Sequence, residues 1–353
     1  MNILITGGCG FVGSSLALYF KSKYPSYQIS VIDNLKRRGS EMNIARLRAM
    51  KIDFMHADIR NAEDLSDIEA MDLILDCSAE ASVLAGIGSS RIQVINNNLI
   101  GTINCLELAL KHKSKFLFLS TSRVYPIEGL EGAKFEELET RFVWTDNQNL
   151  QGISSAGIAE KFPLDGHRSL YGATKLASEL IIKEYHHLFG LETIINRCGV
   201  LSGPWQMGKV DQGVTVLWLA RHFFKNPLIY NGYGGKGKQL RDILHIADLA
   251  NLLDLQIHNW KTGNGEIYNV GGGLNNSASL MELTQIAQKL TGNKIEIKSV
   301  MENRAADIRI YYTDNSKVNK AYNWKPLKNI NAISTDIFNW IEQNQQQLKP
   351  ILS

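Results

Sequence analysis

The sequence predicts an α/β protein built on a doubly wound parallel sheet of the Rossmann type, with a second, smaller α/β lobe. Apolar runs of strand length alternate with amphipathic segments of helix length through the first half of the chain. A glycine-rich turn joins the first run to the first helix, and the alternation becomes irregular after residue 196. We therefore expect one domain over residues 1–195 and a lobe over residues 196–353, part of which returns to the first domain.

The expected elements follow from periodicity. In the first domain, strands are predicted at Ile3–Ile5, Ile29–Ile32, Leu73–Cys77, Phe116–Ser120 and Thr193–Asn196, and helices at Ser14–Lys23, Met42–Ala49, Asn97–His112 and Tyr171–Phe189. In the smaller lobe, strands at Ile267–Val270 and Ile295–Ile297 surround a helix at Ser279–Leu290. Such a sheet binds its ligand at the carboxyl ends of its strands.

The first strand leads directly into the turn Thr6-Gly7-Gly8-Cys9-Gly10-Phe11-Val12-Gly13. Glycines 7 and 10 let the turn tighten and the backbone approach a ligand, and Gly13 lets the following helix pack close to the strand. Backbone N–H groups from Gly7 to Gly13, including those of Phe11 and Val12, then form an anion site at a helix N-terminus. This context predicts the pyrophosphate site of a dinucleotide.

Asp33 indicates which dinucleotide binds. It ends the second strand, 20 residues after Gly13, where a carboxylate can accept hydrogen bonds from the adenosine ribose. The same carboxylate would repel a 2′-phosphate, so we expect NAD rather than NADP. Lys36, Arg37 and Arg38 can in principle bind that phosphate, but a solvated basic turn is the simpler interpretation.

Further polar residues follow the other strands and are candidate cofactor ligands. Asn34 follows Asp33, Asp58-Ile59 follows Phe54-Met55, and Ser78-Ala79 follows the run that ends at Cys77. Asp58 either contacts adenine or serves as a turn carboxylate. Asn98 either begins a helix, holds the cofactor ribose or holds strand backbone.

Composition is that of an ordinary globular enzyme. The 353 residues are 44% hydrophobic and 21% charged, and the net charge of +3 is too small to argue for nucleic acid or a membrane surface. No apolar stretch approaches the ~20 residues that span a bilayer, and a glycine by position 7 leaves no room for a signal-peptide core. Four scattered cysteines and eight histidines show no metal-ligand spacing. We expect a cytoplasmic protein without a metal.

Tyr171 and Lys175 form the candidate catalytic pair. Their i, i+4 spacing places them on one face of a helix. A tyrosine pKa of ~10 must fall by ~3 units, or ~4 kcal/mol, for the phenolate to act as a base near neutrality. The Lys175 ammonium and a positive nicotinamide ring favour that phenolate. A hydroxyl from the strand end Ser120-Thr121-Ser122 can orient the substrate oxygen.

These motifs resemble the extended short-chain dehydrogenase/reductase family over nearly the whole chain. The supporting segments are the glycine turn, Asp33-Asn34-Leu35, Asp58-Ile59-Arg60, Tyr-x-x-x-Lys and Arg241-Asp242-Ile243-Leu244-His245. The family places its active-site Ser or Thr four residues before the Tyr of a Val-Tyr pair. Here that pair is Val124-Tyr125, which implies Thr121 rather than Ser122. Pro126 stands where relatives usually have glycine.

Within the family the sequence is similar to the NAD-dependent nucleotide-sugar epimerases, above all to the CDP-paratose 2-epimerases (CDP-tyvelose epimerases). The segments that carry this likeness are Glu139–Phe142, Phe162–Asp165, Gly203–Gln206, Val210–Gly213 and Gly237–Asp242. The resemblance implies diphosphate contacts from Arg241 and Arg304, which suit a guanidinium fork. Surface salt bridging is their alternative. It also implies that Gln206, Asp211 and Gln212 cover the sugar, although each can instead hold its loop together.

The resemblance thus implies an epimerase that inverts a sugar carbon, C2 in the 2-epimerases, through a transient keto sugar. It also implies a homodimer or homotetramer in which Asn97–His112 and Tyr171–Phe189 pair with their symmetry mates, with Leu106, Leu180, Ile181 and Leu188 as candidate seam residues. A 4,6-dehydratase is the first alternative, but those relatives carry Asp-Glu after the active-site Thr, where this chain has Ser122-Arg123. An NAD-dependent dehydrogenase and a non-catalytic dinucleotide sensor are the others.

Overall fold

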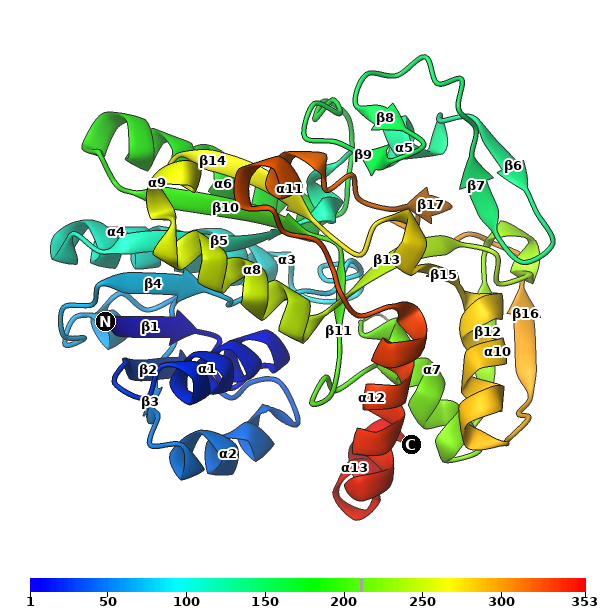
Figure 1. Cartoon of the computed structure of the whole chain (residues 1–353), viewed down its shortest axis with the longest axis horizontal. Coiled ribbons are helices and arrows are strands. Elements are labelled where there is room, and N and C mark those ends of the chain that lie inside the picture. The colour runs from blue at the N-terminus through cyan, green and yellow to red at the C-terminus, as the bar shows by residue number, and fades with distance from the viewer. Residues whose placement is uncertain (210–211) are drawn as a thin grey trace. The chain divides into compact units, whose positions relative to one another are not determined.

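The computed structural model describes residues 1–209 and 212–353 (Figure 1). Residue contacts divide the chain into two compact units, each assembled from separate stretches of sequence. Unit 1 contains residues 1–124, 169–197 and 250–268, and unit 2 contains residues 125–168, 198–249 and 269–353. The assignment of a cofactor-binding domain to residues 1–195 and a nucleotide-sugar lobe to residues 196–353 stays a prediction.

A seven-stranded sheet forms the centre of unit 1. Its strand order is β14-β10-β5-β4-β1-β2-β3. The strands are β1 (Asn2–Thr6), β2 (Gln28–Asp33), β3 (Asp53–His56), β4 (Leu73–Asp76), β5 (Lys115–Thr121), β10 (Thr193–Cys198) and β14 (Glu266–Val270). β1 pairs in parallel with β2 on one side and β4 on the other, so the strand order reverses there. This confirms the predicted doubly wound α/β class, and the reversal is where such folds bind their ligand.

Helices make the crossovers between these strands. They are α1 (Phe11–Lys23), α2 (Asn43–Ala49), α3 (Arg91–Ile95), α4 (Gly101–His112), α6 (Leu170–Phe189), α8 (Ile246–His258) and α9 (Trp260–Gly263), with short 3₁₀ turns at Ser40–Met42, Glu63–Leu65 and Ser122–Val124. Ile3, Leu4 and Ile5 of β1 are fully buried, as expected for a central parallel strand that is covered on both faces. The apolar sides of α4 and α6 pack into a common core with β1, β4 and β5.

Four predicted elements differ from the structure. The strand predicted at Ile295–Ile297 is β16, which runs from Ile297 to Val300. Helix α1 begins at Phe11, inside the glycine motif, rather than at Ser14, because Gly10 already stands at its N-cap. The predicted helix Asn97–His112 is the second part of a longer helical stretch in which a π-helical segment, Asn96–Ile100, joins α3 to α4. The strand predicted in the smaller lobe at Ile267–Val270 is β14, the edge strand of the main sheet.

Unit 2 contains several small sheets with helices. β11 (Val200–Ser202), β13 (Leu240–His245), β15 (Ser277–Ser279) and β17 (Ile310–Tyr311) form a four-stranded sheet, and β12 (Leu228–Asn231) pairs in parallel with β16 (Ile297–Val300). Two hairpins join β6 (Phe135–Glu137) to β7 (Phe142–Trp144) and β8 (Ile153–Ser154) to β9 (Gly157–Ile158). The helices are α5 (Ile127–Glu131), α7 (Val214–Phe223), α10 (Leu280–Thr291), α11 (Ser316–Tyr322), α12 (Ile330–Gln343) and α13 (Gln345–Leu352), with 3₁₀ turns at Tyr233–Gly235 and Leu274–Asn276.

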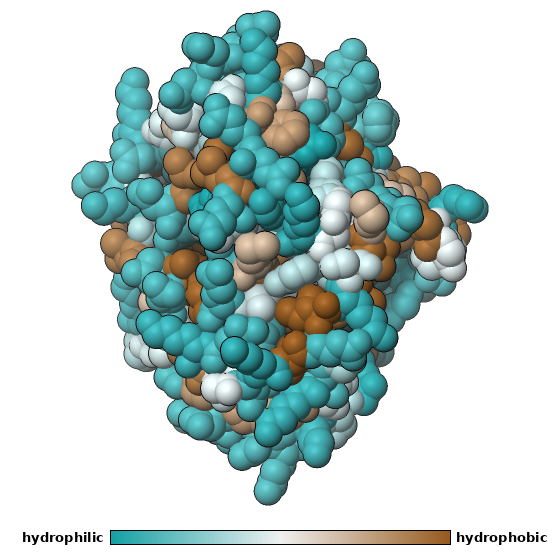
Figure 2. Space-filling view, turned by 90° about the vertical axis from the view of Figure 1, so that its right-hand side faces the viewer, coloured by the Kyte–Doolittle hydropathy of each residue, from teal (hydrophilic) through white to brown (hydrophobic). Residues whose placement is uncertain are grey.

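The molecular surface is mixed in polarity. On the face that Figure 2 shows, hydrophilic residues predominate and hydrophobic ones gather in small, separate patches. Within residues 1–209 and 212–353, no helix is long and apolar enough to cross a membrane. The same part of the chain contains no group of three or more His, Cys, Asp or Glu side chains arranged to hold a metal ion.

Candidate active site

The glycine turn has the geometry of an anion site. Gly7 adopts a φ of +60°, in the left-handed region. A Cβ on Gly13 would lie 2.4 Å from the Gly7 carbonyl oxygen, so only glycine lets the first turn of α1 pack this closely. Among the described residues, no side chain caps this helix and its first turn holds no acidic residue. The backbone N–H groups of Phe11, Val12 and Gly13 therefore begin an α-helix whose N-terminus suits a pyrophosphate.

Asp33 lies beside this turn at the carboxyl end of β2. Its carboxylate accepts hydrogen bonds from the backbone N–H groups of Cys9, at 3.0 Å, and Leu35, at 2.8 Å. Burial raises the pKa of Asp33, while these N–H groups act in the opposite direction. Sequence reasoning missed Asn43, a buried residue of α2 whose amide donates to the Cys9 carbonyl at 2.9 Å. Its residue type at a helix start gave no sign of this contact.

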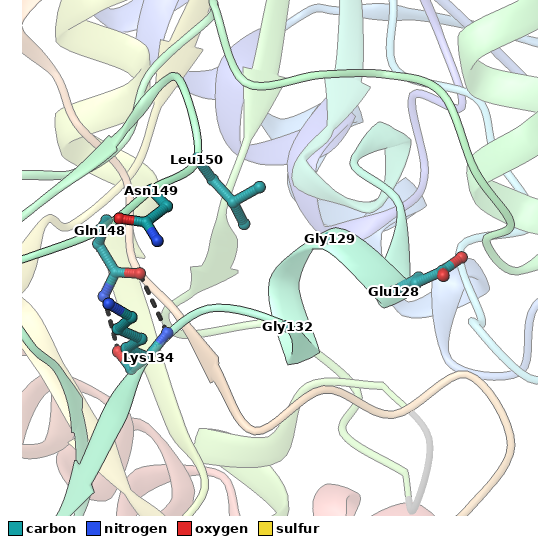
Figure 3. Close-up of a pocket in the computed structure, with 7 residues that line it drawn as sticks. All are labelled: Glu128, Gly129, Gly132, Lys134, Gln148, Asn149 and Leu150. Carbon is teal, nitrogen blue, oxygen red and sulfur yellow. Dashed lines mark hydrogen bonds between the residues drawn. The ribbon is translucent and has the colours of Figure 1, made fainter.

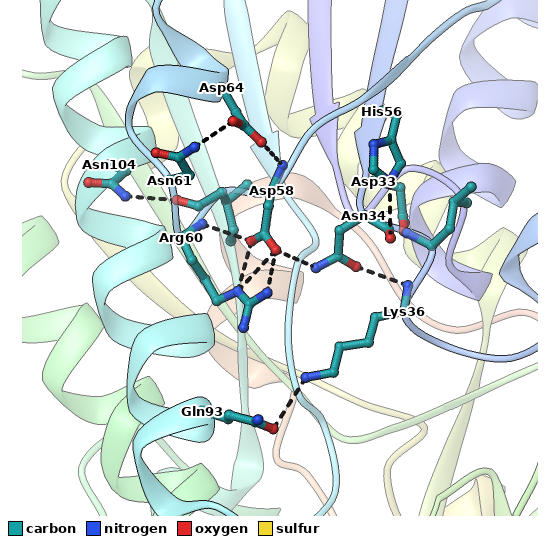
Figure 4. A network of polar contacts seen from close by, with 12 residues as sticks. Asp33, Asn34, Lys36, His56, Asp58, Arg60, Asn61, Asp64, Gln93 and Asn104 are labelled. Atoms are coloured by element: carbon teal, nitrogen blue, oxygen red, sulfur yellow. Dashed lines mark hydrogen bonds and ion pairs between the residues drawn. The ribbon is translucent and has the colours of Figure 1, made fainter.

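Asp58 belongs to a polar network at the end of β3 (Figure 4). It accepts from the Arg60 side-chain Nε at 2.9 and 3.0 Å, and from the Asn34 amide at 3.0 Å. The hydrogen bonds from Arg60 hold the pKa of Asp58 well below its usual range. The Arg60 backbone N–H also donates to it, so Asp58 is a turn carboxylate here, and its contact with adenine stays a prediction. In the same view the Lys36 ammonium reaches Gln93 at 3.3 Å.

The remaining predicted cofactor residues follow β3 and β4. The Ser78 N–H donates to the hydroxyl of Thr6 at 3.3 Å, and Ser78 Cα lies 3.0 Å from the position of a Cβ on Gly7. Ser78-Ala79 therefore runs past the glycine turn. Buried Asn98 accepts from the Glu80 N–H at 2.7 Å and donates to its carbonyl at 3.2 Å. Asn98 therefore bonds to loop backbone after β4 rather than to strand backbone, and its contact with the cofactor ribose stays a prediction. Ile59 packs its side chain into the core, so any contact with NAD comes from its backbone.

The three predicted catalytic residues lie in neighbouring elements of unit 1. Thr121 ends β5, and Tyr171 and Lys175 lie in the first two turns of α6, which begins with the cap Ser169. A Cβ on Gly172 would lie 2.1 Å from the Arg123 carbonyl oxygen. The first turn of α6 therefore rests directly on the segment that follows Thr121.

The side chains of these three residues are shielded from solvent. Thr121, Tyr171 and Lys175 are 7%, 8% and 1% exposed. The Lys175 ammonium lies 3.7 Å from the centroid of the Phe118 ring, a cation–π contact. The Thr121 hydroxyl oxygen accepts from the Arg123 N–H at 3.2 Å, which leaves the hydroxyl proton available for donation. Electrostatic interactions among groups so placed are stronger than in water.

The predicted phosphate residues lie together in unit 2. Arg241, on β13, contacts the Asp307 carboxylate at 2.8 Å and the carbonyl of Leu240 at 2.8 Å. Arg304 reaches the other oxygen of Asp307 at 3.5 Å. One carboxylate thus bonds to both guanidinium groups, which is the salt-bridging alternative, and contacts of Arg241 and Arg304 with a diphosphate stay a prediction.

The predicted sugar-binding loop is only partly described. Gln206 donates its amide to the Leu201 carbonyl at 2.9 Å and accepts from the Ser202 hydroxyl at 3.1 Å, the loop-holding alternative. The backbones of Gln212 and Lys209 exchange hydrogen bonds of 3.0 and 2.8 Å. Asp211 lies outside the described residues, and sugar contacts from all three residues stay predictions.

A cavity of about 340 Å³ in unit 2 lies apart from these residues (Figure 3). Its lining consists of Glu128, Gly129, Gly132, Lys134, Gln148, Asn149 and Leu150. Gln148 accepts from the Lys134 N–H at 3.0 Å, and its amide donates to the carbonyl of Thr145 at 2.9 Å. The polar groups of Gln148 therefore stabilise the loop that contains it. None of the predicted site residues lines this cavity.

Comparison with known proteins places this geometry in context. The family model described as the NAD dependent epimerase/dehydratase family matches residues 3–271. The CDP-paratose 2-epimerase of Salmonella typhi is 31% identical over 351 residues, which cover 96% of this chain and 99% of that protein. The dTDP-glucose 4,6-dehydratase structure from Bacillus anthracis, in complex with NAD, is 26% identical with a TM-score of 0.77 and 99% of each chain covered. The UDP-glucuronic acid 4-epimerase structure from Bacillus cereus shares the fold, with a TM-score of 0.80 at 24% identity, and covers 97% of this chain and 99% of that one.

Proposed function

The chain belongs to the NAD dependent epimerase/dehydratase family, within the extended short-chain dehydrogenases/reductases that its motifs predicted, and we propose that it is a nucleotide-sugar epimerase that inverts C2 of a CDP-hexose. The observation that carries this proposal is that Thr121, Tyr171 and Lys175 are all present. They are buried and lie on elements that are in direct contact. The 31% identity to a CDP-paratose 2-epimerase over nearly the whole chain supports the choice of carbon and carrier.

NAD is the cofactor of this family, as the sequence predicted. The close approach at Gly13 and the carboxylate of Asp33 fit this dinucleotide. The residues that would hold it are Gly7, Gly10, Phe11, Val12, Gly13, Asp33, Asn34, Asp58, Ile59, Ser78, Ala79, Asn98, Tyr171 and Lys175. Bound there, NAD would supply reversible hydride transfer at the sugar carbon, which is the chemistry that inversion through a keto sugar requires.

The protein's own residues then handle the proton. The Tyr171 phenolate takes the proton of the sugar hydroxyl as the C–H bond breaks, and gives it back when that bond is restored. Buried Lys175, one turn further along α6, favours the phenolate by its charge. The Thr121 hydroxyl donates a hydrogen bond to the substrate oxygen, because its own oxygen is already bonded to the Arg123 N–H.

Arg241 and Arg304 are proposed to bind the diphosphate. Both bond to the Asp307 carboxylate, and a diphosphate would offer the same kind of oxygen acceptors to the two guanidinium groups. Gln206, Asp211 and Gln212 would complete the sugar end of the site. These residues select for a nucleotide diphosphate without specifying its base.

Dehydratase chemistry is disfavoured by the two residues after Thr121. Removal of water needs an acid–base pair there, and neither the Ser122 hydroxyl nor the Arg123 guanidinium titrates in the required range. Ser122 is also 9% exposed, within the turn on which α6 rests.

The deciding experiment uses a CDP-hexose deuterated at C2. We expect NMR of the product to show inversion at C2 with the deuterium retained there, because the hydride leaves and returns within one site, and the NAD content of the protein to be unchanged after many turnovers. Loss of the label to solvent would indicate enolisation. Inversion at C4, or release of water, would contradict the proposal.

A further inference from the structure

One buried ion pair of unit 1 is bonded to the strand that carries Thr121. Glu179 of α6 is 1% exposed and Arg197 of β10 is 3% exposed. The Arg197 Nε donates to the two carboxylate oxygens at 3.1 and 3.0 Å, and Nη2 donates to one of them at 2.7 Å. The hydroxyl of buried Ser120 donates to the same carboxylate at 2.5 Å. Glu179 thus joins α6, β10 and β5.

The position of Glu179 along α6 relates it to the catalytic pair. Tyr171, Lys175 and Glu179 follow one another at intervals of four residues, so they share one side of the helix over about 12 Å. On β5, Ser120 directly precedes Thr121. The hydrogen bond between Glu179 and Ser120 therefore fixes the position of α6, along its own axis, relative to the end of β5.

Stability alone is a weak reason for such a pair. Desolvation of two buried charges offsets most of their attraction, and apolar residues of similar volume often stabilise a core equally well. Proton transfer depends more strongly on geometry than stability does, since a misplacement of about 1 Å can reduce a rate about 100-fold. We infer that Glu179 is a positioning residue that holds Tyr171 in register with Thr121. This inference rests on the proposed function of those two residues.

The chain offers a matched control next to Arg197. Asn196 and Gln256 are both fully buried and exchange two amide hydrogen bonds of 2.8 and 2.9 Å between β10 and α8. Because successive residues of a strand face opposite sides, Asn196 lies on the other face of the sheet from Arg197. Loss of this pair removes a buried polar contact of unit 1 that involves neither α6 nor β5.

The test compares Glu179→Gln with Gln256→Met at a temperature at which both variants are folded. We expect both substitutions to lower the unfolding temperature. Glu179→Gln should reduce kcat about 10- to 100-fold and raise the primary deuterium isotope effect, with KM and NAD content within about twofold of the wild type. Gln256→Met should keep kcat and the isotope effect within about twofold. Equal losses in the two variants, or a wild-type kcat in Glu179→Gln, would overturn the inference.

Two further measurements keep the test decisive. If Glu179→Gln does not fold, Ser120→Ala removes only the bond to β5, and it should still lower kcat and raise the isotope effect; wild-type values would refute positioning. If the wild-type protein converts no nucleotide sugar, the proposed function fails, and amide hydrogen exchange over residues 169–178 decides the positioning. Exchange there should be faster in Glu179→Gln, or in Ser120→Ala, than in Gln256→Met, and equal exchange would overturn the inference.

Discussion

At the scale of single residues, Asp33 and Asp58 follow adjacent strands yet have opposite shifts in pKa. Burial raises the pKa of Asp33, whereas the hydrogen bonds from Arg60 lower that of Asp58. The difference arises because burial outweighs the neutral N–H donors at Asp33, whereas a guanidinium faces Asp58. The two carboxylates therefore differ in their electrostatic properties, although both belong to aspartate residues.

The lowered pKa of Asp58 predicts how stability depends on pH. A carboxyl group with a depressed folded pKa contributes its full stability above its unfolded pKa of about 3.9, and loses it as the pH falls below that value. Arg60→Met should therefore lower the free energy of unfolding by about 1 kcal/mol at pH 7. In this variant the free energy of unfolding should also fall less steeply between pH 4 and pH 3. Urea unfolding at both ends of this range measures the effect. Arg48→Met, an exposed position on α2, is the control, and identical curves for the two variants would contradict the assignment.

Tyr171 carries the sharpest prediction for catalysis. Tyr171→Phe removes only the proton-transferring hydroxyl, so the variant should fold and bind NAD but lose roughly 10²- to 10⁴-fold in kcat. Thr121→Ala should lose less, and Lys175→Ala should lose both NAD order and base activation. Steady-state kinetics and the NAD released on denaturation measure these effects. Ser122→Ala is the mild control, and near wild-type turnover in Tyr171→Phe would exclude this base.

Sequence motifs identify the residues of the site better than the contacts that those residues make. The spacing of Tyr171 and Lys175 already indicates one helical face. By contrast, the backbone bonds of Asn98 and Gln206 are seen only in the structure, since an amide can bond to any nearby backbone group. No sequence pattern indicated the pair of Glu179 and Arg197. A buried charged residue is recognised from the partner that neutralises it, and these two residues lie 18 positions apart in the sequence.

At the scale of elements, the contact between α6 and the end of β5 depends on one glycine. Alanine is usually the better helix former by about 1 kcal/mol. Gly172→Ala should nevertheless lower both the unfolding temperature and kcat, because the new methyl group would lie 2.1 Å from the Arg123 carbonyl oxygen. Thermal unfolding and kinetics on the same preparation test this. Gly129→Ala in α5 would meet side chains alone, the Phe162 ring edge at 3.1 Å and Pro126 at 3.5 Å, and should be mild.

The elements that periodicity predicted well are those with local signals. Strands β1, β2 and β5 lie within two residues of their predicted bounds because their apolar runs are continuous. Strand β14 was assigned to the wrong lobe, since its partner β10 lies about 70 residues earlier and no local pattern specifies that pairing. The π-helical segment at Asn96–Ile100 likewise depends on tertiary contacts, including those of Asn98 with Glu80.

At the scale of the whole molecule, assembly through α4 and α6 remains the expectation, with a smaller set of residues. Leu106 packs in the core of its own unit and is unavailable, and Ile181 is partly buried there. Leu180 and Leu188 of α6 are 57% and 64% exposed. Only these two of the four candidate residues project enough apolar surface for a partner subunit to cover.

Sedimentation tests this expectation. The wild-type protein should sediment at twice or four times the chain mass of 39.5 kDa at micromolar concentration. Leu180→Lys combined with Leu188→Lys should shift it toward the monomer, because two charges would be buried in the seam. Leu327→Lys, at a residue 73% exposed in unit 2, is the matched control. A wild-type protein that sediments only as a monomer would refute assembly.

The discontinuous units have a consequence for how the protein is made. The chain passes from one unit to the other five times, after residues 124, 168, 197, 249 and 268. A nascent chain that has left the ribosome only as far as residue 195 still lacks β14 and the whole of α8. Unit 1 cannot be completed until residue 268 has emerged, roughly 4 to 14 s after residue 198 at typical elongation rates. During that interval β10 exposes an unpaired edge, which is the kind of strand edge on which other chains can pair.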